Sequence, residues 1–329
     1  MVASISFPSG QAEPVAIVVG IDIGGTGTRF AVFGPNREIL RRGSVETPGR
    51  GAAVDAFLID QVERITAGFR LQSIGIGASG PIDVHGTIQN PDTLPAFTGV
   101  ALTSTLSTHF GVPVVIDNDA ACAAVAEHAI GAGQGKSSLV HVTLGTGIGV
   151  AVLVDGVALR GSDGEHPEAG HISVSGSTTR CYCGRASCWE QAASRQTLQR
   201  TASLMLGLAP TEPTAVDALA NRASNGDARA MAAFDHYGTR VADGLATLLA
   251  IYRPQAVILG GSGARHLALY RGSLLASLES LGDWISSPTL LGTQLDDFGG
   301  AVGGAIMAER LIGRHVRPSD EVGDEIGRP

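Results

Sequence analysis

The stretch VAIVVGIDIGGTGTRFAVF, residues 15–33, has the same design as the stretch SLVHVTLGTGIGVAVLV, residues 138–154. In each, an apolar run ends in a turn of glycine and threonine, and a second apolar run follows at once. Continuous apolar runs are typical of strands that are buried on both faces. The glycine-rich turn joins two strands, not a strand to a helix, which excludes the dinucleotide-binding and P-loop patterns. The repeat predicts two related strand–turn–strand units in an α/β protein.

Both turns are candidates for phosphate binding, because the backbone amides of a glycine-rich turn can wrap a phosphate group. Asp22, at the end of the first strand, can hold Mg²⁺ through water. One such turn alone is most often an ordinary hairpin, but two copies are far more specific. The residues of the two predicted phosphate-binding turns are Gly24, Gly25, Thr26, Gly145, Thr146 and Gly147.

The stretch EAGHISVSGSTTRCYCGRASCWE, residues 168–190, holds three of the four cysteines of the chain. A histidine lies ten positions before the first of them. This set offers four soft or borderline ligands, which is the number that a closed tetrahedral zinc site needs. The alternatives are free thiols, or a disulfide with one odd cysteine, but a cytosolic chain rarely keeps disulfides. We therefore predict a structural zinc without an open position for catalysis, held by His171, Cys181, Cys183 and Cys188.

Two further positions are ambiguous in the local sequence. Asp117, Asn118 and Asp119 precede an alanine-rich helix, where Asn and Asp serve well as N-caps. A carboxylate at a helix N-terminus is also favoured in its charged form, which suits a general base. Ser79 and Gly80 follow a buried strand and form a turn whose backbone can approach a ligand. For Asp117, Asn118 and Asp119, the local sequence favours the role of helix cap and the role of general base equally.

Periodicity predicts the remaining elements. Helical spacing predicts helices over residues 54–69, 102–110, 120–130, 190–206, 215–223, 228–251 and 301–312. Further apolar runs predict strands over 39–45, 73–78, 113–116, 256–259 and 288–291, and residues 296–304 read as a glycine-rich turn. We expect an N-terminal domain over 15–118, onto which helix 301–312 packs, a C-terminal domain over 119–300, and flexible tails at 1–14 and 313–329.

Composition limits the classes of function. The net charge is −8 and only 16% of residues are charged, below the usual ~25%. The absence of a basic block argues against a nucleic-acid partner. No stretch reaches the ~20 apolar residues of a membrane span, and the N-terminus lacks the features of a signal peptide. The expectation is a cytoplasmic protein in a reducing compartment.

Taken together, the motifs resemble those of the ROK family of sugar kinases over roughly residues 15–312. The motifs, in the family's order, are DIGGTGTR at 22–29, GASGPID at 77–83, DNDAACAAVAEH at 117–128, LGTGIGV at 144–150, EAGH at 168–171 and CYCGRASCWE at 181–190. The last two form a highly specific pair. The resemblance implies the α/β, actin-like ATPase (ribonuclease H-like) fold, with two α/β domains around a cleft. It also implies a homodimer or a dimer of dimers.

The resemblance implies a role for each matching residue. Asp119 would be the general base, taking the proton of the attacking sugar hydroxyl. ATP would be the donor, with Mg²⁺, and the two glycine turns with Asp22 would bind its phosphates. The residues implied to bind the sugar are Gly80, Asn118, Asp119, Glu168, His171 and Glu190, and those implied to border the adenosine are Gly260, Gly261 and Gly263.

Three departures from the family pattern bear on the substrates. Gly27 stands where the family usually has lysine, with Arg29 two positions on, as in relatives that use polyphosphate. Ser187 replaces the glycine usual before the third cysteine. His166 and Pro167 resemble the fructokinase branch, whereas the cysteine loop resembles the glucose and N-acetylhexosamine branches.

The leading hypothesis is an ATP-dependent kinase of the hexose 6-hydroxyl, with glucose first. Fructose, mannose, N-acetylglucosamine and N-acetylmannosamine are alternatives of the same class. The family also contains sugar-responsive repressors, but the first glycine turn near residue 22 leaves no room before it for a helix-turn-helix of ~60–80 residues. A sugar-binding protein without catalysis is the third hypothesis, against which Asp119, Asp22 and both glycine turns argue.

Overall fold

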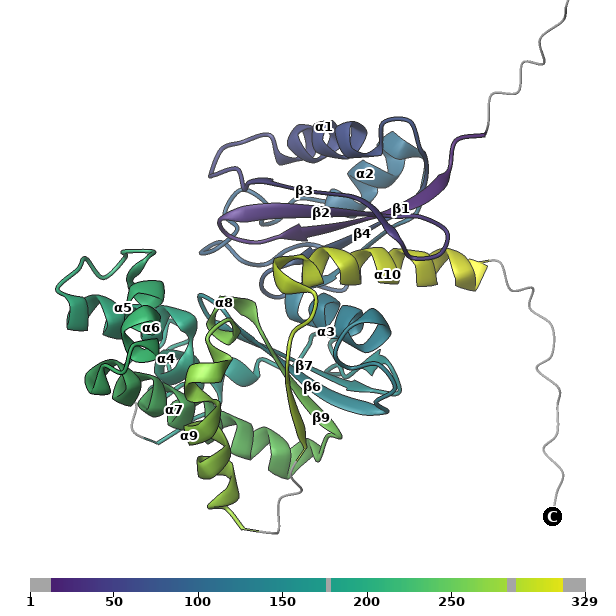
Figure 1. Ribbon diagram of the computed structural model, residues 1–329. Helices are drawn as coiled ribbons and strands as arrows, with labels where there is room; N and C mark the ends of the chain where they lie inside the picture. Colours follow the sequence, from purple (N-terminus) through teal and green to yellow (C-terminus); the bar gives the residue numbers. More distant parts are fainter. Residues whose placement is uncertain (1–12, 176–178, 283–287, 316–329) are drawn as a thin grey trace, which may run out of the picture.

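The computed structural model describes residues 13–175, 179–282 and 288–315 of the chain. Its first sheet has the strand order β3-β2-β1-β4-β5, in which β1, β2 and β3 are antiparallel and β4 and β5 run parallel to β1. The helices α1 (Val54–Thr66) and α2 (Leu102–Phe110) cover its outer face and share its apolar core (Figure 1). The strands are β1 (Ala16–Ile23), β2 (Gly27–Phe33), β3 (Ile39–Glu46), β4 (Arg70–Ala78) and β5 (Val114–Asn118).

The second sheet has the order β10-β9-β6-β7-β8. It repeats the first sheet strand for strand, because β6, β7, β8, β9 and β10 stand in the order of β1, β2, β3, β4 and β5. The predicted repeat is therefore confirmed, and each glycine turn follows the central strand of its sheet. The strands are β6 (Ser138–Leu144), β7 (Ile148–Val154), β8 (Val157–Ala158), β9 (Ala256–Gly260) and β10 (Thr289–Gly292).

A group of helices covers the outer face of the second sheet and forms the largest apolar core with it. The 25-residue helix α7 packs against α9, α6 and α4. A 3₁₀ turn, η1 (Ala169–His171), leads into the cysteine loop. The helices are α4 (Trp189–Ala193), α5 (Arg195–Leu206), α6 (Ala215–Ser224), α7 (Ala228–Tyr252), α8 (Gly261–Ala264) and α9 (Leu267–Glu279).

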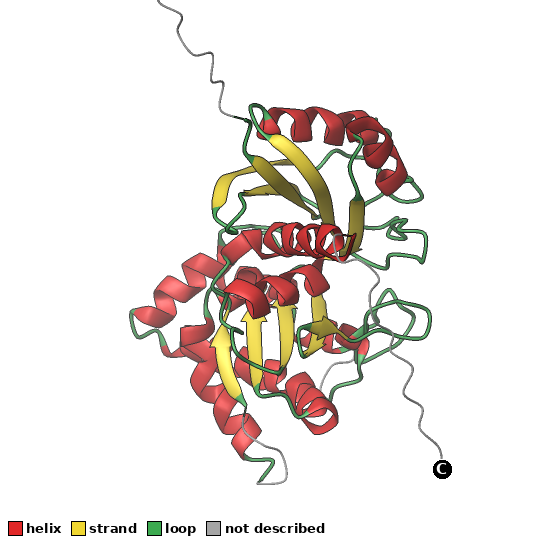
Figure 2. Cartoon of the chain, turned by 90° about the vertical axis from the view of Figure 1, so that its right-hand side faces the viewer, coloured by secondary structure: helices red, strands yellow, loops and turns green. Residues whose placement is uncertain are grey.

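Two helices, α3 (Asp119–Ile130) and α10 (Gly299–His315), lie between the two sheets (Figure 2). They pack against each other, and α10 also packs against β1 and β4. Their shared core consists mainly of alanine, so the backbones come close. A Cβ atom built on Gly20 would lie 1.7 Å from the carbonyl oxygen of Ala301, and one on Gly75 would lie 1.8 Å from that of Gly304. Glycine at these positions makes the close crossing of helix and sheet possible.

The structure corrects several sequence predictions. Residues 296–304 do not form a glycine-rich turn: Asp296–Phe298 is a 3₁₀ turn, η2, and α10 begins at Gly299. The glycines serve close packing instead. The helix predicted over 190–206 is broken at Ser194, whose hydroxyl oxygen accepts from the backbone N–H of Thr197 and caps α5. The short strand β8 was not predicted. Helix α10 extends to His315, and residues 1–12 and 316–329 of the predicted tails lie outside the described residues.

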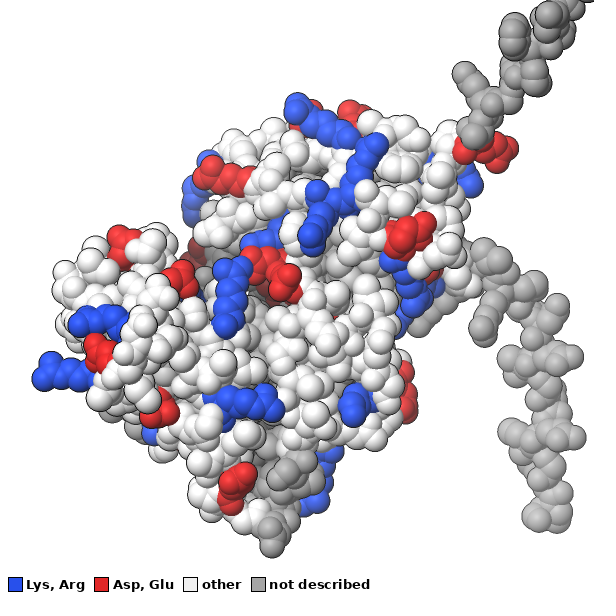
Figure 3. Space-filling model, in the orientation of Figure 1, with Lys and Arg blue, Asp and Glu red and all other residues white. Residues whose placement is uncertain are grey.

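The face of the molecule in Figure 3 carries acidic and basic side chains in small groups over a largely uncharged surface. In the described part of the chain, no helix is long and apolar enough to cross a membrane.

The close packing of α10 predicts a contrast between two helical glycines. In Gly303→Ala, the new Cβ atom would lie 1.8 Å from the backbone oxygen of Cys122 in α3. We expect the free energy of unfolding to fall by about 3 kcal/mol or more, since helix backbone cannot give way as a side chain can. In Gly272→Ala, in α9, the Cβ atom meets nothing within 4 Å, so we expect a gain of up to about 1 kcal/mol from helix propensity. Urea unfolding of both variants tests this, and equal changes would contradict it.

Candidate functional site

The carboxyl ends of β1, β4 and β5 meet at one edge of the first sheet, because these strands are parallel and in register. Asp22 pairs in register with Gly77, and Asn118 with Ala78, so the ends carry their polar residues to the same place. Ligands of open α/β sheets bind at such edges. Gly80, just beyond β4, has φ 92°, a conformation that favours glycine, and its carbonyl accepts from Asn118 Nδ2 at 3.2 Å.

The structure assigns different tasks to Asn118 and Asp119. Asn118 is the N-cap of α3, and its Oδ1 accepts from the backbone N–H groups of Ala120 and Ala121 at 2.8 and 3.3 Å. Asp119 is the first residue of the helix, and its Oδ1 accepts from Ala120 N–H at 2.8 Å. Burial raises the pKa of the Asp119 carboxyl above its usual range. The cap is therefore filled by the neighbour, and the half-buried Asp119 carboxylate is available for another partner.

Asp22 lies next to the first glycine turn with its side chain only 13% exposed. Arg29 Nη1 stands 3.7 Å from its Oδ2. Burial, and then the negative charge of Asp119, raise the pKa of Asp22 to about 7, against the lowering effect of Arg29, while Asp297 adds a smaller rise. Carboxylates that repel one another in this way favour a bound cation, and oxygen ligands are those that Mg²⁺ prefers. These residues fit a magnesium ion.

A second group of carboxylates comes from the two ends of the cysteine loop: Glu168 directly precedes η1, and Glu190 is the second residue of α4. Burial raises the pKa of Glu168, and the charges of Asp119 and Glu190 raise it further. Glu190 is buried, and its Oε2 accepts from the backbone N–H of Ile148 at 3.1 Å. A Cβ atom on Gly147 would lie 2.1 Å from the same oxygen. The structure thus brings Asp119, Glu168 and Glu190 together and sets the last of them against the second glycine turn.

The four predicted zinc ligands lie between these two glutamates in the sequence and gather in one cluster. Their ligand atoms all lie within 4.8 Å of one another. His171 Nδ1 stands 3.5 Å from Cys181 Sγ, and Cys183 Sγ stands 3.6 Å from Cys188 Sγ. In a tetrahedral site with Zn–S bonds of about 2.3 Å, sulfur atoms lie about 3.8 Å apart. The spacing therefore fits a zinc ion, and His171 Nε2 points away from it, 3.2 Å from the hydroxyl of Tyr182.

The loop also explains one departure from the family pattern. Ser187, just before the third cysteine, has φ 64°, in the left-handed region that favours glycine. Serine can adopt this conformation at a cost of roughly 1 kcal/mol. The turn is kept, since the carbonyl of Ser187 accepts from the N–H of Val174 at 2.8 Å. His166 is buried beside the loop, with its Nε2 3.5 Å from Glu168 Oε1.

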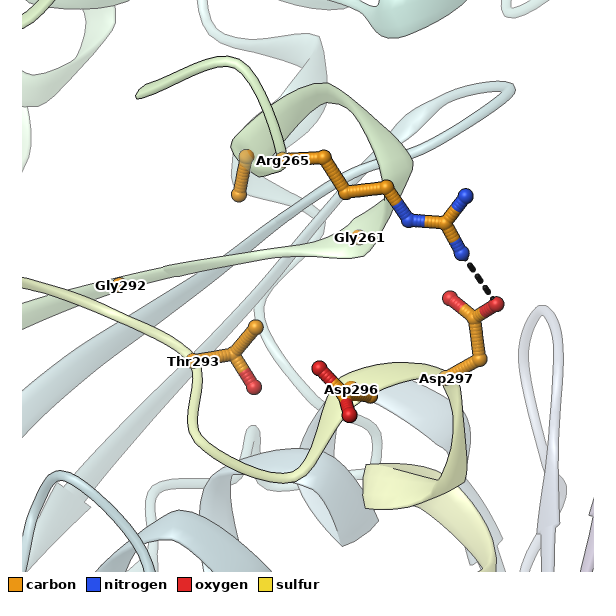
Figure 4. A pocket seen from close by; sticks show the side chains of 7 residues that line it. Gly261, Arg265, Gly292, Thr293, Asp296 and Asp297 are labelled. Atoms are coloured by element: carbon orange, nitrogen blue, oxygen red, sulfur yellow. Dashed lines mark hydrogen bonds and ion pairs between the residues drawn. The ribbon is translucent and has the colours of Figure 1, made fainter. Parts of the chain in front are cut away.

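The predicted adenosine-binding glycines lie at the end of β9, next to a pocket of about 120 Å³. Gly261 lines this pocket with φ 74°. Figure 4 shows Arg265, the residue that follows α8, reaching Asp297 of η2 at the pocket's edge, where the two form an ion pair. Arg265, Thr293, Asp296 and Asp297 line the pocket. None of these four residues was predicted from the sequence: Asp296 and Asp297 fall in the segment expected to be a glycine-rich turn, and no local pattern marks Arg265 or Thr293.

The zinc site predicts a difference between two cysteines. We expect Cys183→Ser to lose most of its bound zinc, because a closed structural site needs all four ligands. Cys122→Ala is the matched control: Cys122 is buried between Ile76 and Met307, outside the loop, and should keep the metal. The measurement is the zinc content of the purified variants. Zinc unchanged in Cys183→Ser would refute the ligand set.

The raised pKa of Asp22 predicts a pH-dependent stability. Folding disfavours the charged form of Asp22, which lowers the free energy of unfolding. This loss of stability is absent below pH 3.8 and grows until the pH reaches about 7. Asp22→Asn removes this cost, and its stability gain over wild type should increase by about 2 kcal/mol or more between pH 5 and pH 7.5. Urea unfolding in magnesium-free buffer measures it, with the exposed Asp92→Asn as control. A gain that does not change with pH would contradict the prediction.

Comparison with known proteins agrees with this geometry. A family model described as the ROK family matches residues 18–310. The glucokinase of Thermotoga maritima is 30% identical over 320 residues, which cover 91% of this chain and 99% of the relative. The crystal structure of a ROK family glucokinase from Streptomyces griseus in complex with glucose and AMPPNP is 30% identical, with a TM-score of 0.77, covering 89% of this chain and 99% of that one.

A regulator is also similar. The DNA-binding transcriptional repressor Mlc of Escherichia coli is 30% identical over 215 residues, which cover 63% of this chain and 52% of the repressor. The likeness to the solved glucokinase extends over nearly the whole fold and confirms the predicted α/β, actin-like ATPase architecture. With a family model that spans almost the entire described structure, this chain belongs to the ROK family.

Proposed function

We propose that this protein is an ATP-dependent kinase that phosphorylates the 6-hydroxyl of a hexose, with glucose as the first candidate. The observation that carries the proposal is the position of Asp119. Its carboxylate stands at the start of α3 without serving as the cap, next to Asp22 on one side and Glu168 on the other. A single base between a phosphate-binding turn and a set of sugar-binding carboxylates is what phosphoryl transfer to an alcohol requires.

In the proposed reaction, Asp119 accepts the proton of the sugar hydroxyl as its oxygen attacks the γ-phosphorus of ATP. The bond from this phosphorus to the bridging oxygen breaks, and ADP leaves. Because the pKa of Asp119 is raised, it lies closer to neutral pH, and this favours proton transfer to the carboxylate. Mg²⁺, when bound near Asp22, neutralises the charge of the phosphates. The backbone N–H groups of the two glycine turns orient them.

Sugar recognition falls to groups with hydrogen-bonding capacity left over. Asn118 uses Oδ1 for the cap, and its Nδ2, which carries two N–H groups, donates to the Gly80 carbonyl. Glu168 is half exposed and presents acceptor oxygens. The zinc loop holds His171 and Glu190 at either end, which limits the entropy lost when the sugar orders them. This arrangement favours a hexose as the substrate. It does not distinguish glucose from fructose, mannose or N-acetylhexosamines, which the assay below compares.

The test is a coupled phosphorylation assay over these sugars, with ATP and with polyphosphate as separate donors. Wild type should turn over one sugar best. Asp119→Asn should lower kcat by about 10²–10⁴-fold, because only the base is removed. Its dissociation constant for the sugar, from calorimetry, should stay close to that of wild type.

Near-normal turnover by Asp119→Asn would remove this residue as the base. Silence of wild type across the panel with both donors, in protein shown to contain zinc, would favour a sugar-binding regulator. The similarity to the repressor Mlc makes that the second candidate.

A further inference from the structure

Helix α3 carries a second carboxylate, Glu127, that the proposed reaction does not use. Its side chain is completely buried. It lies eight residues after Asp119, or about 12 Å along the same helix. Burial of a carboxylate is costly unless hydrogen bonds compensate. No lysine, arginine or histidine of the described residues forms an ion pair with it. The reason for a buried charge at this place must therefore lie in its hydrogen bonds.

Both carboxylate oxygens of Glu127 accept hydrogen bonds, and they do so from two different segments of the chain. Oε1 accepts from Thr293 Oγ1, from Gln294 N–H at 2.9 Å and from Leu295 N–H at 3.2 Å. Oε2 accepts from Ala132 N–H at 2.7 Å. A Cβ atom on Gly131 would lie 2.2 Å from Oε2, so the glycine leaves room for the carboxylate. The carboxyl group of Glu127 therefore accepts hydrogen bonds from four donors.

Three of these donors belong to the segment that forms a wall of the pocket beside Gly261. Thr293 lines this pocket, and the same segment continues into Asp296 and Asp297, which line it too (Figure 4). Asp296 has φ 50°, a strained conformation that a residue without glycine's freedom keeps only when its surroundings hold it. The bonds to Glu127 restrain the chain immediately before this residue. We define residues 293–297 as the pocket wall.

A buried residue of the second sheet also lies near Glu127. His141 of β6 is buried and close enough for the Glu127 charge to act on it, while burial lowers the pKa of His141 to about 4. It is therefore a neutral ring at neutral pH. A Cβ atom on Gly260 would lie 2.8 Å from His141 Nε2. His141, which lies near Glu127, therefore packs against Gly260, directly before the glycine that lines the pocket.

We propose that Glu127 is a positioning residue for the donor nucleotide: it fixes the pocket wall to the helix that carries Asp119. The inference rests on the proposed function, because it assigns the nucleoside end of the donor to this pocket. Since α3 is one rigid helix, the bonds at Glu127 set the distance between the wall and the base. Loss of these bonds should weaken nucleotide binding much more than sugar binding.

Glu127→Gln separates this role from simple packing. Glutamine has nearly the same shape, but its amide has one acceptor oxygen and one NH₂ group, which cannot accept. Either Ala132 N–H or the donors of the pocket wall then lose their acceptor. We expect the dissociation constant of a non-hydrolysable ATP analogue to rise about tenfold or more, as for a lost bond to a charged group. We expect less than about threefold for the sugar, whose contacts are remote from Glu127.

Hydrogen exchange of the ligand-free protein gives a readout that does not depend on activity. In Glu127→Gln, the amides of residues 293–298 or of 131–133 should exchange faster, while the rest of the protein should be unchanged. Glu63→Gln, an exposed glutamate on α1, is the matched control and should change neither exchange nor binding. Thr293→Val removes only one donor and should weaken analogue binding in the same direction, by less. It also tests the idea if Glu127→Gln does not fold.

The possible failures are distinguishable. Wild type that binds no analogue and phosphorylates no sugar would overturn the proposed function and this inference with it. Wild type that binds both, with analogue affinity unchanged in Glu127→Gln and Thr293→Val, would overturn the inference alone. Equal weakening of analogue and sugar, with faster exchange throughout, would show that Glu127 serves overall stability and not the pocket.

Discussion

The close packing of α3 and α10 between the two sheets is the constraint on which the rest of the structure depends. Glycine in the strands meets alanine or glycine in α10, and Gly303 of α10 meets the backbone of α3. The helices and strands are packed so closely that no added atom fits between them. A shift of one element against another would therefore lose dispersion contacts. Asp22 lies at the end of β1, next to Gly300 at the start of α10, and Asp119 is the first residue of α3. The packing therefore decides how close the two carboxylates come, and hence how strongly they repel each other.

This crowding of negative charge gives the candidate site its chemistry. Burial raises the pKa values of Asp22, Asp119, Glu168 and Glu190, and the negative charge of Asp119 raises those of Asp22 and Glu168 further. A site that holds several carboxylates in a poorly solvated space binds cations and hydroxyl donors well. Arg29 opposes the charge only in part, at 3.7 Å from Asp22. The cluster of His171 and three cysteines would contribute in a different way: a zinc ion bound there would close the loop between Glu168 and Glu190, so that less entropy is lost when these side chains are ordered.

The internal repeat of the fold explains why the site has two glycine turns. Each sheet has its central strand followed by a tight turn and an antiparallel neighbour, and the strand orders of the two sheets correspond. The turns differ in what approaches them. Asp22 lies beside the first, and Glu190 lies against the second, which leaves no space for a side chain at Gly147. Glu127 adds a link of another kind, because its buried carboxylate ties the pocket wall at 293–297 to the body of α3.

The sequence by itself determined the elements whose signal is local. Buried strands read as apolar runs, the repeat was visible as two copies of one pattern, and the spacing of His171 and the three cysteines indicated a metal loop whose ligand atoms do gather. Only the tertiary structure decided the meaning of the glycines at 299–304, since a run that allows a turn equally allows a helix to press against a sheet. Only it decided between Asn118 and Asp119 for the helix cap. The role of Glu127 could not be predicted from the sequence, because three of its four donors lie 166 to 168 positions away. Burial and hydrogen-bond partners at such distances follow from the packing of the whole chain, which no local pattern contains.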